Sequence, residues 1–321
     1  MDIRILKAFI FILLTVTGIP GNLYIVLQFL VIRLLEKKLL PSNIILQVLA
    51  FSNLLIVCSR VIPQSLNALG IEDLMDGINC KISGYTYRVS RAMSICITSL
   101  LSCHQCILIA PNTKIWAYLK KMVSPNITLI ILAILLMNLA LYRTSFMYAD
   151  ARNNNTSPYT LHLVYCDTDF QTYVSYIANG VVFASRDFLF VASMVLASFY
   201  IVYVLLNHKK TVTSILYSNR AKSKSIEYKA SKAVILLVIC YVMFMGLDNS
   251  MWTYTLTLSN VGTNMNDARV VLACAYSAVC PIVIFVTNPK LQQWSRYTFW
   301  RRHQDQRSSS SSEIHLKHIS I

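Results

Sequence analysis

The sequence predicts an all-α membrane protein that folds as a bundle of seven spanning helices. Its composition is 55% hydrophobic and only 13% charged, whereas soluble domains average about 25% charged residues. The charged residues also gather in clusters that are separated by long apolar runs, instead of being spread along the chain. Two soluble domains, which 321 residues would allow, are excluded by this distribution.

Each apolar run is long enough to cross a bilayer. A spanning helix needs about 20 apolar residues, because the hydrocarbon core is about 30 Å thick and each helical residue rises about 1.5 Å. The runs are Ala8–Ile32, Ser42–Ser59, Ala92–Thr113, Met122–Tyr142, Phe188–Leu206, Ala233–Ser259 and Val270–Pro289. Strands of a membrane β-barrel would be about 10 residues long with strict alternation, which these runs do not show.

With their flanking residues, the runs predict helices over 5–32, 42–66, 80–113, 122–146, 172–207, 230–259 and 267–289. We expect residues 1–304 to form one membrane domain and residues 305–321 to form a disordered cytosolic tail. The first run is longer than the core of a signal peptide, which has about 7–15 residues, and it lacks a small-residue cleavage site. It is therefore expected to be the first helix of the mature protein.

Lysine and arginine near the helix ends predict the orientation, because cytoplasmic loops carry an excess of both. With the N-terminus outside, the inner segments hold 19 basic residues: three in 33–41, three in 111–124, seven in 207–232 and six after residue 289. The outer segments hold four. We therefore expect an outside N-terminus and a cytosolic C-terminus. This asymmetry accounts for most of the net charge of +15, and no nucleic-acid-binding motif accompanies it.

Topology also sorts the nine cysteines. Cys80 and Cys166 alone fall in outer segments, where the compartment is oxidising, so a disulfide between them is predicted to tie the longest outer loop to the third helix. The other cysteines lie in helices and are expected to pack as small apolar residues. Cys103 and Cys106 share a helix face beside a histidine, but no second ligand pair accompanies them, and the sequence predicts no metal or cofactor.

A series of short motifs runs along the chain in a fixed order. It comprises Ser52-Asn53-Leu54-Leu55, Ser59-Arg60-Val61-Ile62-Pro63-Gln64, Cys80-Lys81, Tyr87-Arg88-Val89-Ser90-Arg91 and Ser94-Ile95-Cys96. Over about Gly21–Pro289 this series resembles the vomeronasal type 1 receptors and the fish olfactory receptor class A-related group, which are G-protein-coupled receptors with a rhodopsin-like bundle. The usual acidic-Arg-Tyr triplet is absent, and His104-Gln105-Cys106 stands in its place.

The resemblance implies a receptor for small pheromones or odorants in the plasma membrane of chemosensory neurons. It also implies a heterotrimeric G protein of the inhibitory type as partner, with arrestin as a second partner and membrane lipid around the bundle. The residues expected to contact the G protein are His104, Gln105, Lys209 and Lys210. Those expected to be phosphorylated are Ser308, Ser309, Ser310, Ser311 and Ser312.

Charges at membrane depth are costly, so each one is a functional candidate. Arg88 and Arg91 follow Cys80 by eight and eleven residues, and at i and i+3 they share a helix face with Tyr87 nearby. The outer layer is predicted to hold five arginines and two aspartates, which leaves an excess of three positive charges if all of them face inward. These are Arg60, Arg88, Arg91, Arg143, Arg186, Asp187 and Asp248, with Trp252 and Tyr254 as aromatic walls. An organic anion would supply the missing charge, since arginine binds carboxylates bidentately.

Other interpretations stay open at this stage. Arg91 with Asp187 or Asp248 can instead form a buried structural pair, and a cationic or neutral ligand remains compatible with the sequence. A bitter-taste receptor is the nearest alternative family. A transporter would spread its charges through the full depth of the membrane, whereas these cluster in the outer half. No Ser-His-Asp, metal-ligand or paired-carboxylate arrangement supports an enzyme.

A glycosylation sequon offers a test of the predicted orientation. Asn154-Asn155-Thr156 lies in the long outer loop, whereas Asn126-Ile127-Thr128 begins the fourth helix on the cytosolic side. We expect Asn154→Gln to remove an endoglycosidase-sensitive increase in mass on a denaturing gel, and Asn126→Gln to leave the band unchanged. The opposite pattern would reverse the predicted orientation.

Overall fold

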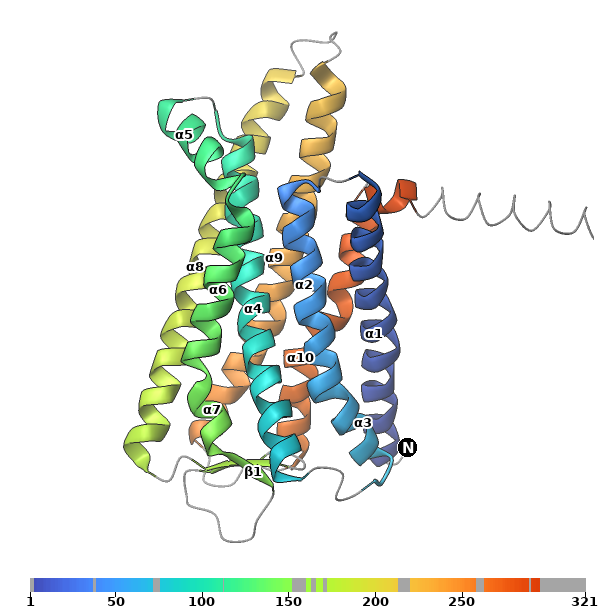
Figure 1. The fold of residues 1–321 in the computed structure, drawn as a ribbon, viewed down its shortest axis with the longest axis vertical. Helices are drawn as coiled ribbons and strands as arrows, with labels where there is room; N and C mark the ends of the chain where they lie inside the picture. Colours follow the sequence, from blue (N-terminus) through green and yellow to red (C-terminus); the bar gives the residue numbers. More distant parts are fainter. Residues whose placement is uncertain are drawn as a thin grey trace, which may run out of the picture.

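The computed structural model is a bundle of long, roughly parallel and antiparallel helices (Figure 1). It describes residues 3–36, 39–71, 76–111, 113–151, 160–162, 166–169, 172–212, 220–257, 263–288 and 290–294. Within these ranges seven helices are long and apolar enough to cross a membrane. The predicted all-α, seven-helix fold class is therefore confirmed.

The helices follow one another along the chain with short connections. They are α1 (Ile3–Glu36), α2 (Pro41–Ile56), the π-helical turn η1 (Val57–Val61), α3 (Ile62–Ala68), α4 (Gly77–Ile109), α5 (Lys114–Val123), α6 (Ile127–Leu141), α7 (Arg143–Tyr148), α8 (Tyr173–Val212), α9 (Arg220–Thr257) and α10 (Thr263–Thr287). The α4 helix ends at Ile109, because the residue before Pro111 is driven out of the helical conformation: Ala110 is extended. The separate helix α5, which follows it, was not expected from the sequence.

Three short strands lie in the loop between α7 and α8. They are β1 (Ala149–Ala151), β2 (Thr160–His162) and β3 (Cys166–Asp169), and β3 pairs antiparallel with both of the others. Cys166 of β3 forms a disulfide with Cys80 in the first turn of α4. The sheet closes the end of the bundle at which α1 begins (Figure 1). We call this end the disulfide end and the other the opposite end.

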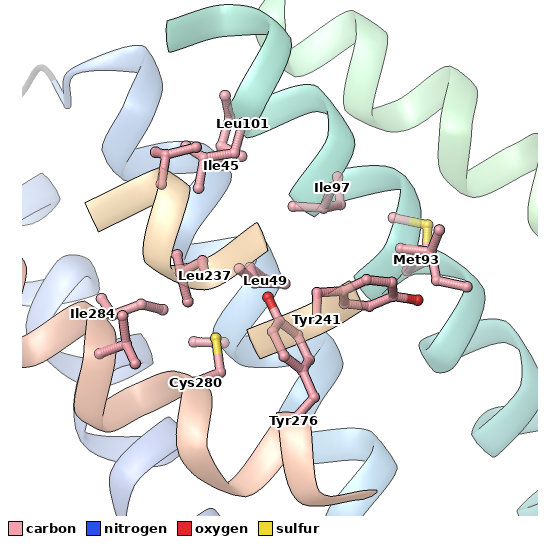
Figure 2. Close-up of a cluster of buried hydrophobic side chains, with 14 of the residues drawn as sticks. Ile45, Leu49, Met93, Ile97, Leu101, Leu237, Tyr241, Tyr276, Cys280 and Ile284 are labelled. Carbon is pink, nitrogen blue, oxygen red and sulfur yellow. The ribbon is translucent and has the colours of Figure 1, made fainter. Parts of the chain in front are cut away.

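The α4 helix occupies the centre of the bundle. In its span 72% of the most apolar window is buried within the protein, compared with 17% in the span Tyr173–Asn207. Apolar side chains from α2, α4, α9 and α10 meet around it, as Figure 2 shows. The ring of Tyr241 packs edge-on against Tyr276 with centroids 4.9 Å apart, and the Tyr276 hydroxyl lies 3.1 Å from that of Thr98. Many large apolar side chains on the outer helices are exposed, as a lipid-facing surface requires.

Pro281 shapes the contact between α10 and α1. A proline lacks the N–H that would bind the carbonyl four residues earlier, and here that carbonyl belongs to Ser277. The side-chain amide of Asn22 donates to it over 2.9 Å. Unpaired backbone groups are costly in a membrane, so the buried Asn22 compensates for the proline. Gly21 lets the Pro281 ring approach α1 closely, since a Cβ there would lie 2.9 Å from its Cγ.

Pro63 has the same effect in the second span. Its missing N–H frees the carbonyl of Ser59, which accepts a 2.7 Å hydrogen bond from the hydroxyl of Ser83 on α4. The backbone widens into the π-helical turn η1 just before the proline. Such a turn inserts one extra residue and rotates the side chains that follow it. This rotation bears on Arg60, which lies within the turn.

The close packing at Gly21 leads to a stability prediction. We expect Gly21→Ala to lower the free energy of unfolding of the purified receptor by about 1–3 kcal/mol, and with it the melting temperature. The reason is that the rigid Pro281 ring cannot move out of the way of the new methyl group. The matched control is Gly84→Ala, whose Cβ would meet nothing within 4 Å. It is expected to be neutral or stabilising, because alanine is the better helix former. Equal melting temperatures for the two variants would contradict this account.

Candidate functional site

Four arginines gather inside the disulfide end of the bundle. Arg60 comes from η1, Arg88 and Arg91 from α4, and Arg269 from α10. All four side chains are half-buried. They surround Tyr87 and the buried Asp248, which lies on α9. We call these four residues the arginine cluster.

Asp248 joins three helices through its two oxygens. Its Oδ2 accepts a 2.7 Å hydrogen bond from Arg91 Nη2, and its Oδ1 lies 3.9 Å from Arg269 Nε. Only 4% of the Asp248 side chain is exposed, so its charge has to be balanced locally. Of the two partners that the sequence allowed for Arg91, the structure selects Asp248.

Arg60 enters the cluster because of the π-helical turn. Its guanidinium carbon lies 5.6 Å from the centre of the Tyr87 ring, a cation–π distance. Within the described part of the chain it makes no side-chain hydrogen bond, and its buried Nε has no partner. Most of the donors of this guanidinium group are therefore unused.

Arg88 connects the cluster with the loop that carries the small sheet. It donates to the hydroxyl of Ser145 on α7 at 3.4 Å and to that of Thr168 on β3 at 3.3 Å. Thr168 is buried and lies two residues beyond Cys166. The disulfide therefore fixes β3 where Thr168 reaches Arg88. Both partners are neutral hydroxyls, so the charge of Arg88 is not matched by them.

Arg186 and Asp187 form a separate group on α8. The two side chains are paired with each other, and Arg186 also donates to Asn138 Oδ1 over 2.8 Å. Its guanidinium carbon lies 5.1 Å from the centre of the Tyr142 ring. This pair is internally neutral. Arg143 does not face the interior, because its side chain is exposed on α7 just after the helix breaks at Tyr142.

The arginine cluster holds more positive charge than its described neighbours neutralise. The cluster contains four guanidinium groups, and among the described residues the one carboxylate that contacts it is Asp248, which is paired with Arg91 and Arg269. This leaves an excess of three positive charges within the described part of the chain. The buried Nε atoms of Arg60, Arg91 and Arg269 also lack hydrogen-bond partners among the described residues. Each arginine can donate five hydrogen bonds, and a buried donor that stays unpaired costs about 1–3 kcal/mol. The cluster is therefore suited to an anion with several acceptor oxygens.

Sequence reasoning did not find Arg269 or the neighbouring Asp267. Both lie just before the last apolar run, where charges are ordinary. In the structure Asp267 is paired with Lys7 of α1 at 2.5 Å and accepts from Gln64 of α3 at 2.7 Å. This neutral group ties three helices together at the disulfide end. In the sequence, Asp267 and Arg269 stand as two charged residues near the start of a predicted helix. Such a pattern by itself does not indicate which residues of other helices they contact.

Other predicted site residues lie toward the opposite end or outside the described residues. His104 and Gln105 are buried and both lie 3.4 Å from the hydroxyl of Ser42, at the start of α2. They therefore join α4 to α2 instead of forming the surface of this end. Asn154 and Ser308 to Ser312 fall outside the described residues, as do the side chains of Lys209, Lys210, Trp252 and Tyr254.

Comparisons with known proteins agree with this architecture. The family model described as the vomeronasal organ pheromone receptor family matches residues 5–297. The chain is 34% identical over 299 residues to olfactory receptor class A-like protein 1 of Danio rerio, across 91% of this chain and 92% of the relative. It is 27% identical over 285 residues to vomeronasal type-1 receptor 3 of Homo sapiens, across 85% and 88%. The crystal structure of squid rhodopsin has the same fold, with a TM-score of 0.67 and 19% identity over 92% of this chain and 86% of that one.

The fold and the family match together define a G-protein-coupled receptor, a multi-pass membrane protein that binds a ligand and a G protein. Within that class the chain belongs to the vomeronasal organ pheromone receptor family. This confirms the resemblance on which the sequence interpretation relied. Membership of this particular receptor family decides against a bitter-taste receptor, a transporter and an enzyme.

The shared carboxylate gives a prediction about stability. We expect Asp248→Leu to destabilise the receptor by about 3–5 kcal/mol, because Arg91 and Arg269 would remain buried without a counter-charge. The double variant Arg91→Met/Asp248→Leu should recover part of this loss, since an apolar pair of similar volume replaces the ion pair. Melting temperatures in detergent measure both effects. If the double variant is no more stable than Asp248→Leu, the pairing of Arg91 with Asp248 is not what stabilises α9.

Proposed function

We propose that this receptor detects a small organic anion, which binds at the arginine cluster, and that it transmits the signal to an inhibitory-type heterotrimeric G protein. The observation that carries this proposal is the excess of three positive charges around Tyr87 and Asp248. Arginine groups in a half-buried setting bind carboxylates with short, charge-assisted hydrogen bonds. A neutral or cationic ligand would leave the excess uncompensated.

Arg88 and Arg91 are the residues that we assign to direct contact. They lie three positions apart on α4, so their guanidinium groups share a face of the helix. Tyr87 lies one turn before Arg91 and adds an aromatic surface and a hydroxyl. Trp252 lies one turn after Asp248 on α9 and, with Tyr254, is proposed to enclose the remainder of the ligand. Asp187 is assigned an indirect part, since it neutralises Arg186.

The same geometry suggests how binding is transmitted. A ligand carboxylate competes with Asp248 for Arg91, which at present joins α4 to α9. Weakening that pair lets α9 move relative to α4, because a ligand shifts the equilibrium toward the state that it binds better. The opposite end, which the charge asymmetry assigns to the cytosol, would then accept the G protein near Lys209 and Lys210. His104 and Gln105 would take part once they separate from Ser42.

The names of the relatives support a proposal about the cellular setting. The relatives are named as olfactory and vomeronasal receptors, so we place this receptor in the plasma membrane of chemosensory neurons. The disulfide end would face the environment, where an odorant or pheromone arrives. Phosphorylation within Ser308 to Ser312 would recruit arrestin and end the response.

The proposal is tested by the response of cells to matched ligands. Small aryl and alkyl carboxylates are compared with their amides and with amines of the same shape. We expect carboxylates alone to activate the G protein, and Arg88→Gln to reduce their potency by about 10–100-fold, the value of a lost hydrogen bond to a charged group.

Arg143→Gln is the matched control, because this arginine is exposed and lies outside the cluster. Surface expression is measured for every variant, so that a folding defect is separated from a loss of binding. Activation by amines, or equal losses of potency for Arg88→Gln and Arg143→Gln, would contradict an anionic ligand.

A further inference from the structure

The α5 helix presents an apolar stripe that no described part of the protein covers. Ile115, Tyr118 and Met122 are 73%, 66% and 54% exposed. Their spacing of three and four residues places them on one side of the helix. Lys114 and Lys121 are also exposed, and they project at the edge of the stripe. The helix contains no aspartate or glutamate.

The position of α5 along the bundle can be read from α8. The ring of Trp116 stacks on that of Tyr200, with centroids 5.6 Å apart. Beyond Tyr200, α8 goes on exposing apolar side chains, with Tyr203 at 62% and Leu206 at 58%. Toward the C-terminal end of α8, the first polar residue after this apolar stretch is Asn207. It follows Tyr200 by seven residues, which separates the two by about 10 Å along the helix at 1.5 Å per residue. Trp116 therefore lies at a level where α8 still faces hydrocarbon.

Contacts with the bundle fix which side of α5 points outward. Lys120 Nζ donates to the carbonyl of Ala110 over 2.9 Å and so holds the helix against the end of α4. Val123 packs on the main core and Trp116 packs beside Tyr200. The remaining side, which carries the apolar stripe and the two exposed lysines, is left to the surroundings.

We propose that α5 lies in the membrane interface and binds anionic lipid. The apolar stripe enters the acyl-chain boundary, and Lys114 and Lys121 bind the phosphate or carboxylate of the headgroups, as amphipathic interfacial helices do. Charge complementarity selects the lipid, because the helix has only positive charges. Depth selects a lipid over a soluble partner, which would have to reach about 10 Å below the polar boundary of α8.

The test is hydrogen–deuterium exchange of residues 113–124 in the full-length receptor, reconstituted in nanodiscs. Discs of phosphatidylcholine alone are compared with discs that also contain phosphatidylserine. We expect amide exchange in this segment to be about 30-fold slower with phosphatidylserine, because two lysines near an anionic surface together contribute about 2 kcal/mol. This comparison needs no variant, so it stands even if a variant fails to fold.

Variants separate the two parts of the proposal. Lys114→Gln/Lys121→Gln should remove the dependence on phosphatidylserine, and Ile115→Ser/Met122→Ser should speed exchange in both lipids. Ala117→Ser, an exposed position on another side of the helix, is the control and should behave as wild type. Equal exchange in the two lipids overturns the proposal. If exchange in this segment slows only after a G protein is added, the proposal is also overturned, and the stripe is assigned to that protein. Neither outcome depends on which ligand activates the receptor.

Discussion

Inside a membrane, a polar group must find its partner within the protein, because hydrocarbon offers none. Two features of this bundle follow from that constraint. Pro281 and Pro63 each leave a carbonyl unbonded, and in each case a side chain from a neighbouring helix donates to it, Asn22 to Ser277 and Ser83 to Ser59. A defect in one helix thereby becomes a specific contact with another. The prolines thus help to set which helices are neighbours.

The same constraint explains why the arginine cluster is informative. The other described ion pairs at the disulfide end are balanced: Lys7 with Asp267, and Arg186 with Asp187. Asp248 by contrast is paired with both Arg91 and Arg269, while the described hydrogen-bond partners of the Arg88 side chain are the hydroxyls of Ser145 and Thr168. Locally uncompensated charge in an apolar bundle carries a cost that selection would remove unless it served a purpose. We propose that an anionic ligand supplies that purpose.

The two ends of the bundle differ in how they are closed. At the disulfide end, β3 is held by the bond between Cys80 and Cys166 and reaches the cluster through Thr168. At the opposite end, His104 and Gln105 hold α4 to α2 through the single hydroxyl of Ser42 at 3.4 Å. The first closure is covalent, whereas the described contacts at the second are hydrogen bonds and an ion pair between Lys290 and Glu36 at 2.6 Å. This difference supports the proposal that ligand binds at the disulfide end and that the opposite end opens to the G protein.

Hydropathy and charge along the chain determined the seven spans, the pairing of Cys80 with Cys166 and the presence of arginines near the disulfide end. These are local properties, since they depend on which residues follow one another. Short polar segments carry weaker patterns, and both the sheet beside β3 and the α5 helix were missed for that reason. Tertiary structure alone decided that Arg91 pairs with Asp248, that Arg269 joins the cluster and that Arg143 faces outward. The physical reason is that successive residues of a helix are rotated by about 100°. One π-helical turn, or one break in a helix such as that at Tyr142, therefore points a side chain in a new direction without altering the hydropathy of its span.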